Sequence, residues 1–194
     1  MIFSLQGKVQ ELTPTYAVMN VGGVGYYVGI SLMTSQNLAA GQDAMLYTQQ
    51  IIREDAHLLF GFITRSEKEM FNLLISVNGV GAVSALILLS TLSLSDIASA
   101  ILSRNSAVIQ KAKGLGAKTA ERIIVDLKDK VARFASEEEN NSAAVDNKVK
   151  DEALSALEVL GISRRMSEKL ADRVMKQNPA VSVEELVKQI LKNM

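Results

Sequence analysis

Two short stretches of the chain carry the residue types best suited to binding a phosphate. Residues 78–89 read NGVGAVSALILL and residues 113–124 read KGLGAKTAERII, so the pattern of Gly, aliphatic residue, Gly and Ala occurs twice. Glycines allow a tight backbone turn with no side chain in the way, and the amide N–H groups at the start of the next helix can then face an anion. The repetition predicts one phosphate-binding device used twice.

Cationic side chains flank the second stretch. Lys113 and Lys118 would add point charges beside its glycines, and Arg122 would add a guanidinium group. Such contacts read the nucleic-acid backbone and the shape of the groove rather than the base sequence. The alternative is that the Gly and Ala residues only allow close helix packing. Two copies in one basic segment make that alternative weaker.

The charge of the chain is balanced as a whole but not along its length. The chain carries 21 basic and 21 acidic residues, and this balance alone argues against a nucleic-acid binder. Residues 64–135, however, hold 10 basic and 6 acidic residues, and eight of these cations lie between Arg104 and Arg133. A local excess of this kind, in the segment with the Gly repeats, is typical of a surface that faces phosphates.

The sequence offers little for catalysis or metal binding. It has no Cys and a single histidine, His57, so a metal triad or a nucleophile with its base has little to draw on. The stretch GLGAKT differs from a nucleotide-binding P-loop, because Ala117 stands where that loop has Gly. We therefore expect no catalytic residue, no metal and no cofactor.

The composition favours a cytoplasmic protein. The absence of Cys fits a reducing compartment, and the start MIFSLQGKVQ lacks the basic and apolar regions of a secretory signal. The stretch from Met70 to Ser95 is uncharged, but a turn signal interrupts it. We therefore expect two buried helices there rather than a membrane span.

Four consecutive regions must position these motifs. Residues 1–64 have the texture of short strands separated by turn clusters, which predicts a β-barrel of the oligonucleotide-binding (OB) type, with an SH3-like barrel as the alternative. Residues 65–134 change to a helical period and hold both Gly motifs, which predicts a tandem helix-hairpin-helix domain. Residues 135–147 have the composition of a flexible acidic linker. Residues 148–194 predict a three-helix domain that binds a partner.

The chain resembles the RuvA family, the DNA-binding subunits of the bacterial Holliday-junction branch-migration complex. The resemblance rests on VGGVGYYV and REDAHLLFGF in the barrel, on NGVGAVSA and KGLGAKTAERIIVDLKDK in the central domain, and on ALEVLGI near the end. It implies a non-catalytic subunit that binds four-way junction DNA in recombination, DNA repair and the SOS response. It also implies a homotetramer with four-fold symmetry, with an octamer left open, and two protein partners: a RuvB-type hexameric ATPase motor and a RuvC-type junction resolvase.

The same resemblance assigns site residues one at a time. Glu54 and Asp55 match the acidic pin that keeps the strands apart at the crossover. The positions where the family contacts the DNA backbone are Asn78, Gly79, Gly81, Gly114, Gly116, Lys118 and Arg122. The positions that match its motor-binding patch are Leu157, Leu160, Ile162 and Leu191. The chain departs from the family at Ala82–Val83, where the family often has Pro-Lys, and at Ala117–Lys118, where it often has two lysines. Fewer fixed charges would flatten the salt dependence of DNA binding.

Several alternatives remain open at this level. The acidic pair could be an ordinary polar turn, and the leucines of ALEVLGI could all belong to a core. The chain could be a helix-hairpin-helix glycosylase, although that class needs a base-flipping pocket and a catalytic Lys or Asp just past the hairpin, whereas Asp126 and Asp129 lie well down the next helix. It could also be a protein-binding adaptor, in which the hairpins would pack inward.

Overall fold

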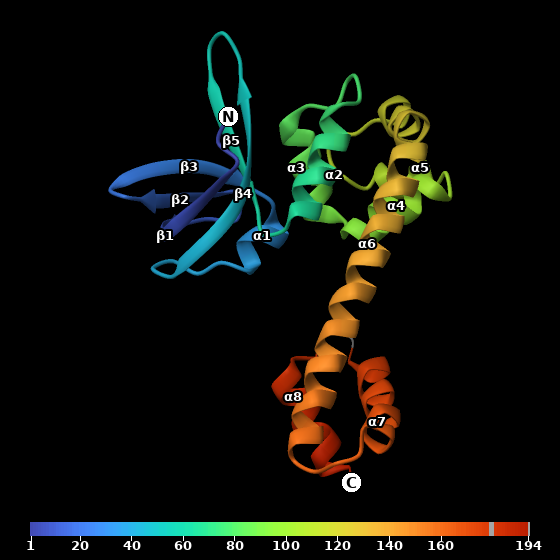
Figure 1. Cartoon of the computed structure of the whole chain (residues 1–194). Coiled ribbons are helices and arrows are strands. Elements are labelled where there is room, and N and C mark those ends of the chain that lie inside the picture. The colour runs from blue at the N-terminus through green and yellow to red at the C-terminus, as the bar shows by residue number, and fades with distance from the viewer. Residues whose placement is uncertain (179–180, 194) are drawn as a thin grey trace. The chain divides into compact units, whose positions relative to one another are not determined.

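The chain forms two compact units. The computed structural model describes residues 1–178 and 181–193, and it describes the side chains of these residues except 136–148, 165–166 and 176–177. The first unit is Met1–Ala135 and the second is Ser136–Met194. Each unit is described by itself (Figure 1).

The first unit begins with a closed five-stranded barrel. Its strands are β1 (Ser4–Leu12), β2 (Tyr16–Val21), β3 (Val24–Ile30), β4 (Asp43–Ile52) and β5 (His57–Phe62). They follow the order β1-β2-β3-β5-β4 around the barrel, and only β3 and β5 run parallel. A short helix, α1 (Leu32–Gln36), joins β3 to β4. The closed five-stranded arrangement confirms the predicted OB-type barrel.

Local sequence explains the strands and turns of the barrel. In β4, for example, Leu46 and Thr48 are buried while Met45 is exposed, which is the alternation expected of a strand with one face on a core. The turn between β2 and β3 has Gly22 and Gly23 with φ values of 60° and 89°, and two positive φ angles are what a two-residue hairpin turn requires. The barrel core is made by Leu5, Val9, Ala17, Met19, Val28, Ile30, Leu38 and Leu46.

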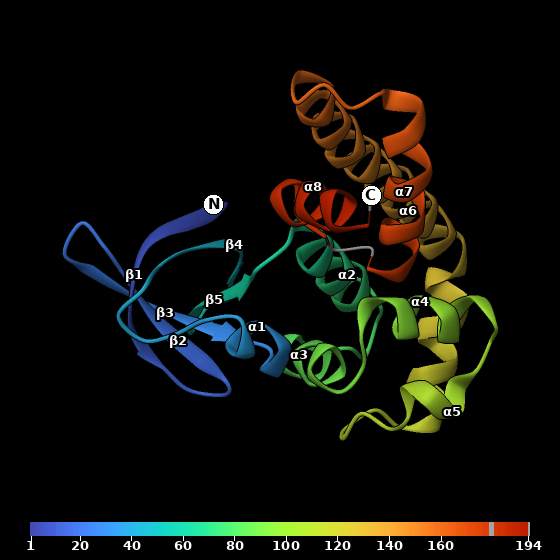
Figure 2. The same cartoon turned by 90° about the horizontal axis from the view of Figure 1, so that it is seen from below.

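Five helices complete the tandem helix-hairpin-helix region that follows the barrel. They are α2 (Arg65–Ile75), α3 (Ala82–Thr91), α4 (Leu94–Leu102), α5 (Ser106–Ile109) and α6 (Ala117–Val159). Helix α2 starts with a capping box in which the Thr64 side chain accepts from the Glu67 amide and the Glu67 side chain accepts from the Thr64 amide. Helix α1 lies beside α3 in Figure 2, and the Leu32 amide donates to Ser90 Oγ over 2.9 Å.

A single core holds these helices against the barrel. Phe60 and Phe62 of β5 pack on Phe71 of α2, with ring centroids 5.2 and 4.9 Å apart. The same cluster runs through Leu88 and continues to Leu127 of α6. In the part of the chain that the structure describes, no single helix is long and apolar enough to cross a membrane. Helices α3 and α4 pass that test only as a pair, and they meet at a bend of 102°.

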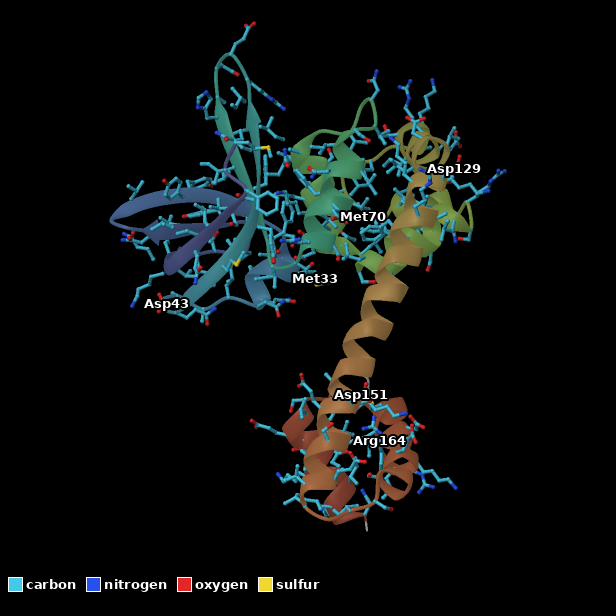
Figure 3. The ribbon with its side chains drawn as sticks, in the orientation of Figure 1. Met33, Asp43, Met70, Asp129, Asp151 and Arg164 are labelled. Atoms are coloured by element: carbon cyan, nitrogen blue, oxygen red, sulfur yellow. The ribbon has the colours of Figure 1, made fainter. Side chains whose placement is uncertain are left out.

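The second unit is built from the end of α6 and two further helices, α7 (Arg164–Gln177) and α8 (Val183–Lys192). The core includes Leu154, Leu157, Leu186 and Ile190. Arg164 at the start of α7 donates to Asp151 of α6 over 2.6 Å, and the two side chains point toward each other in Figure 3.

The predicted linker falls inside the bounds of α6. The chain has neither Gly nor Pro between Phe134 and Val159, so nothing in the sequence ends a helix there. Nearly all of residues 135–147 lie outside the residues whose side chains the structure describes. The flexibility of this segment and the four domain boundaries therefore stay predictions.

Candidate nucleic-acid interface

The first Gly motif forms the turn between α2 and α3. Gly79 has a φ of 93°, in the left-handed region that favours glycine. The Val80 amide donates to the Val77 carbonyl over 3.0 Å and closes the turn. Gly81 then acts as the N-cap of α3 with a φ of −85°, and its carbonyl accepts from the Ala85 amide over 3.0 Å.

The second Gly motif repeats this geometry between α5 and α6. Gly114 has a φ of 92°, and the Leu115 amide donates to the Ala112 carbonyl over 3.2 Å. The Gly116 carbonyl accepts from the Ala120 amide over 3.0 Å, as the Gly81 carbonyl does in the first turn. The predicted repeat is therefore present as two turns with matching backbone hydrogen bonds. We call them hairpin 1 (residues 76–81) and hairpin 2 (residues 110–116).

One apolar residue anchors each hairpin, and its glycines face open space. Val80 and Leu115 are buried in the core. A Cβ atom built on Gly79, Gly81, Gly114 or Gly116 would meet no other atom within 4 Å. The positive φ explains Gly79 and Gly114. It does not explain Gly81, whose extended backbone suits any residue, so the fold itself gives no reason for a glycine there. Close helix packing fails as an explanation for these glycines.

The two hairpins differ in charge. Lys113 and Lys118 are exposed beside hairpin 2. Arg122 lies one turn further along α6, with its Nε atom 4.0 Å from Oδ2 of Asp126, and both side chains are largely exposed. At the matching places of hairpin 1 the chain has the exposed Asn78 and Val83, and Val83 is 67% exposed. Hairpin 1 thus presents a backbone without a cation, and hairpin 2 presents the same backbone with several.

The acidic pair occupies the turn between β4 and β5. The Arg53 amide donates to the Ala56 carbonyl over 2.8 Å, so Glu54 and Asp55 stand at the tip of a closed turn. Both are exposed, and neither forms an ion pair with any described side chain. In Figure 1 this turn projects from the barrel at the end of the first unit where hairpin 1 also lies and where α6 begins.

The four residues predicted to bind the motor separate into two groups. Leu157 is fully buried in the core of the second unit, and Ile162 packs against that core. Leu160 is 63% exposed, and Leu191 is 45% exposed. The sequence prediction missed Val159, which directly precedes Leu160 and is 88% exposed. The helical period could have found it, because Leu154 and Leu157 point to the core and Val159 falls on the opposite face.

Groups for metal chemistry do not come together in the described part of the chain. No cluster of three or more His, Asp or Glu side chains occurs among the described residues. His57 is the first residue of β5, is exposed, and pairs with Ile52 across the β4–β5 ladder. It is a strand residue beside a turn.

Three domain families match the chain in succession. The RuvA N-terminal domain matches residues 1–61, a SAM-like helix-hairpin-helix tandem matches residues 71–129, and the RuvA C-terminal domain matches residues 148–194. Similar proteins include the Holliday junction branch migration complex subunits RuvA of Christiangramia forsetii, 43% identical, and of Flavobacterium psychrophilum, 46% identical, each over the full length of both chains. The RuvA subunit of Cytophaga hutchinsonii is 39% identical over 99% of both chains.

Proposed function

The chain belongs to the RuvA family of Holliday junction branch migration complex subunits, and we propose that it binds each arm of a four-way junction through both hairpins. The family is that of the non-catalytic DNA-binding subunit. Four protomers in a cyclic ring would offer one pair of hairpins to each arm.

The geometry of the hairpins carries this proposal. Two turns with matching φ angles and matching backbone hydrogen bonds lead into the N-termini of α3 and α6, where the first amides of a helix have no partner within the helix. A helix N-terminus with free N–H groups attracts a phosphate, and an open glycine lets the phosphate approach the backbone closely. Gly81 supports the proposal most directly, because only a molecule from outside would need the space that a side chain would fill there.

The two hairpins would contribute different kinds of contact to DNA binding. Hairpin 1, with Asn78, binds a phosphate by hydrogen bonds from its backbone and an amide side chain. Hairpin 2 adds Lys118 and Arg122, whose charges displace counterions from the DNA. Because Asp126 lies beside Arg122, DNA competes with that carboxylate for the guanidinium. None of these contacts distinguishes one base from another, so binding follows DNA structure rather than sequence.

Glu54 and Asp55 would act as the pin at the crossover. Their exposure at the tip of a closed turn supports this role, because two unpaired carboxylates there repel a phosphate that approaches the centre. An open junction can route its strands around four such turns. A continuous duplex that crosses the centre cannot.

The second unit would bind the motor, a RuvB-type ATPase. Val159, Leu160 and Leu191 are the exposed apolar residues that support this assignment, while Leu157 is buried and anchors the end of α6 in the core. Leu160→Ser should leave the thermal midpoint unchanged and lower the stimulation of the partner's ATPase. Leu157→Ala should instead cost about 2–5 kcal/mol of stability. An unchanged ATPase response in Leu160→Ser would remove Leu160 from the motor surface. The RuvC-type resolvase and the roles in recombination, repair and the SOS response follow from the family alone.

A mobility-shift comparison tests the DNA-binding proposal. A four-way junction and a linear duplex of equal length and sequence content are titrated in parallel, and strand scission is followed on the same samples. We expect tighter binding of the junction, no cleavage and little dependence on sequence. Cleavage or base release would favour the glycosylase class. The absence of any DNA binding would favour a protein-binding adaptor, a class that the outward-facing glycines already make less favoured.

A further inference from the structure

Arg104 follows the end of α4 and has a backbone conformation that is unusual for an arginine. Its φ is 57°, in the left-handed region, which is disfavoured for residues with a Cβ atom. Among the described residues, the six other positions with a positive φ are all glycines. Glycine is also the residue most often found where a helix ends in this conformation. The turn itself therefore gives no reason for an arginine here.

The end of α4 does not need the guanidinium group either. The amides of Arg104 and Asn105 donate to the carbonyls of Ile101 and Ala100, over 3.2 and 2.8 Å. Ser103 Oγ donates to a further carbonyl one turn earlier, over 2.6 Å. These bonds satisfy carbonyl groups that a helix leaves open at its C-terminus. A glycine at position 104 would end the helix equally well.

The charge of Arg104 belongs to a stretch of the chain that holds cations only. The sequence has no acidic residue between Asp96 and Glu121. The cations of that stretch are Arg104, Lys111, Lys113 and Lys118. All are exposed, and Arg104 forms no ion pair with any side chain that the structure describes. An exposed surface with one sign of charge is typical of a region that faces phosphates.

A groove of about 360 Å³ lies between the end of α4 and hairpin 2. Ser103 and Asn105 line it at the end of α4, and Lys111 of hairpin 2 lines it as well. Asn105 directly follows Arg104, and its side chain forms no capping hydrogen bond at the start of α5. The groove thus offers a hydroxyl group, an amide group and a lysine to an anion, and the guanidinium group belongs to the residue next to them in the chain.

The one acidic residue that lines this groove is occupied elsewhere. Asp96 lies near the start of α4, where its Oδ2 atom accepts a hydrogen bond from Ser93 Oγ over 2.6 Å. Arg104 lies beyond the other end of the same helix, roughly 12 Å away along its axis. The carboxylate of Asp96 therefore leaves the charge of Arg104 available to an anion from outside the chain.

The groove is short, and packing holds its two sides in place. Ile101 of α4, Ile109 of α5 and Leu115 of hairpin 2 are buried in one core, so an anion would meet donors that are already positioned. Helix α5, which joins the two sides, has four residues and is roughly 6 Å long. Duplex DNA carries one negative charge per roughly 1.7 Å of its axis, so a span of that length holds roughly three or four phosphates. A duplex held at hairpin 2 therefore presents further phosphates to the end of α4.

We propose that Arg104, together with Asn105 and Lys111, forms a third phosphate contact that continues the DNA path beyond hairpin 2. The planar guanidinium group can donate two parallel hydrogen bonds to one phosphate, which a lysine cannot. This contact uses side chains, whereas the two hairpins use backbone amides. The unfavourable φ is retained because the DNA contact needs a long cationic side chain at this point. The inference rests on the proposed function, since hairpin 2 must hold the duplex before Arg104 reaches it.

The first test separates DNA binding from stability. Arg104→Gly removes the cation and suits the left-handed backbone, so the thermal midpoint of the full chain should not fall. Binding to junction and duplex should weaken a few-fold, and the plot of log affinity against log salt should flatten by about 0.9 for the phosphate no longer neutralised. Lys192→Gly, at the exposed last residue of α8, removes the same charge and should leave the slope unchanged. A lower midpoint with an unchanged slope would make Arg104 a structural residue and overturn the proposal.

The second test varies the side chain at the same backbone position. Arg104→Lys keeps the charge and should keep the salt slope, while its affinity falls because the paired hydrogen bonds are lost. Arg104→Asn tolerates the left-handed backbone but lacks the charge, so its slope should match that of Arg104→Gly. If Arg104→Lys flattened the slope as much as the uncharged variants, the charge of Arg104 would not be what meets the phosphate.

A third comparison distinguishes this contact from the hairpins and from a protein partner. If the wild-type chain binds junction and duplex but Arg104→Gly keeps the wild-type slope, the third contact is refuted and the proposed function stands. If the wild-type chain binds neither DNA, the proposed function fails and this inference fails with it. If Arg104→Gly keeps the DNA slope but lowers the stimulation of the partner's ATPase, Arg104 faces an acidic protein surface and the proposal is overturned.

Discussion

Hairpin 1 and hairpin 2 have the same backbone and different side chains. Gly79 and Gly114 have φ angles of 93° and 92°, and equivalent backbone hydrogen bonds close the two turns. Yet Val83 stands where Lys118 stands in the second copy. The comparison separates two contributions to DNA binding that usually occur together. The backbone of a hairpin positions a phosphate, and the cations around it set how strongly binding depends on salt.

Blocking the shared backbone should have the largest effect. Gly81→Val and Gly116→Val together would place side chains where the phosphates approach. Charge-assisted hydrogen bonds contribute about 1.5–3 kcal/mol each, so we expect a loss of roughly 10- to 150-fold in affinity for each hairpin blocked. Folding should be preserved, because Gly81 has an extended backbone and a Cβ atom added at Gly81 or Gly116 would meet no other atom within 4 Å.

The measurement is the dissociation constant for junction and duplex at one fixed salt concentration. Ser155→Val, an exposed position of α6 in the second unit, adds the same side chain elsewhere and should change nothing. Wild-type affinity in the double glycine variant would show that the hairpins do not contact DNA.

Removing the charges of hairpin 2 should have a smaller and different effect. Lys118→Ala with Arg122→Ala should weaken binding to all DNA alike. It should also flatten the plot of log affinity against log salt by about 0.9 for each phosphate that the protein no longer neutralises. Val83→Ala is the matched change in hairpin 1 and should leave the slope as it is. If the two variants gave equal slopes, the hairpins would not differ as their charges indicate.

Neutralising the acidic turn tests whether the hairpins alone make the chain bind a four-way junction more tightly than a duplex. Glu54→Gln with Asp55→Asn should tighten duplex binding by roughly five-fold, because two unit charges 4 Å apart repel by about 1 kcal/mol in water. Assembly should be unaffected. The ratio of duplex to junction dissociation constants, measured at two salt concentrations, should fall toward one. A ratio that stays constant would make Glu54 and Asp55 an ordinary turn.

Giving hairpin 1 a cation should have the smallest effect. Val83→Lys should steepen the salt dependence by about 0.9 and tighten binding a few-fold at low salt. The gain is limited, because a lysine near a helix N-terminus costs about 0.3–1 kcal/mol. Val24→Lys, at the exposed first residue of β3, adds the same charge as a control. Equal steepening in both variants would attribute the effect to net charge rather than to hairpin 1.

Much of the fold could be predicted because its signals are local. Residues 1–64 were predicted to form short strands separated by turns, and β2 (Tyr16–Val21) and β3 (Val24–Ile30) follow that pattern on either side of Gly22 and Gly23, since alternation and flanking glycines act within a few residues. The helices around the Gly motifs were predicted for the same reason. The bounds of α6 could not be predicted in this way, because residues 135–147 are polar but contain no helix breaker, and the flexibility expected of them stays a prediction.

Some features of the candidate sites also follow from local sequence, and others follow only from tertiary packing. The sequence by itself determined where the chain turns at Gly79 and Gly114, because a positive φ is a property of the residue and its neighbours. Tertiary structure alone decided which leucine is buried. Leu157 and Leu160 are three residues apart in one motif, but the first is buried in the core of the second unit, while the second lies past the end of α6. Tertiary structure also brought Phe3 to Lys68 and Tyr47 to Arg65, because these residues are distant in the sequence and meet only when the barrel closes and α2 packs on it.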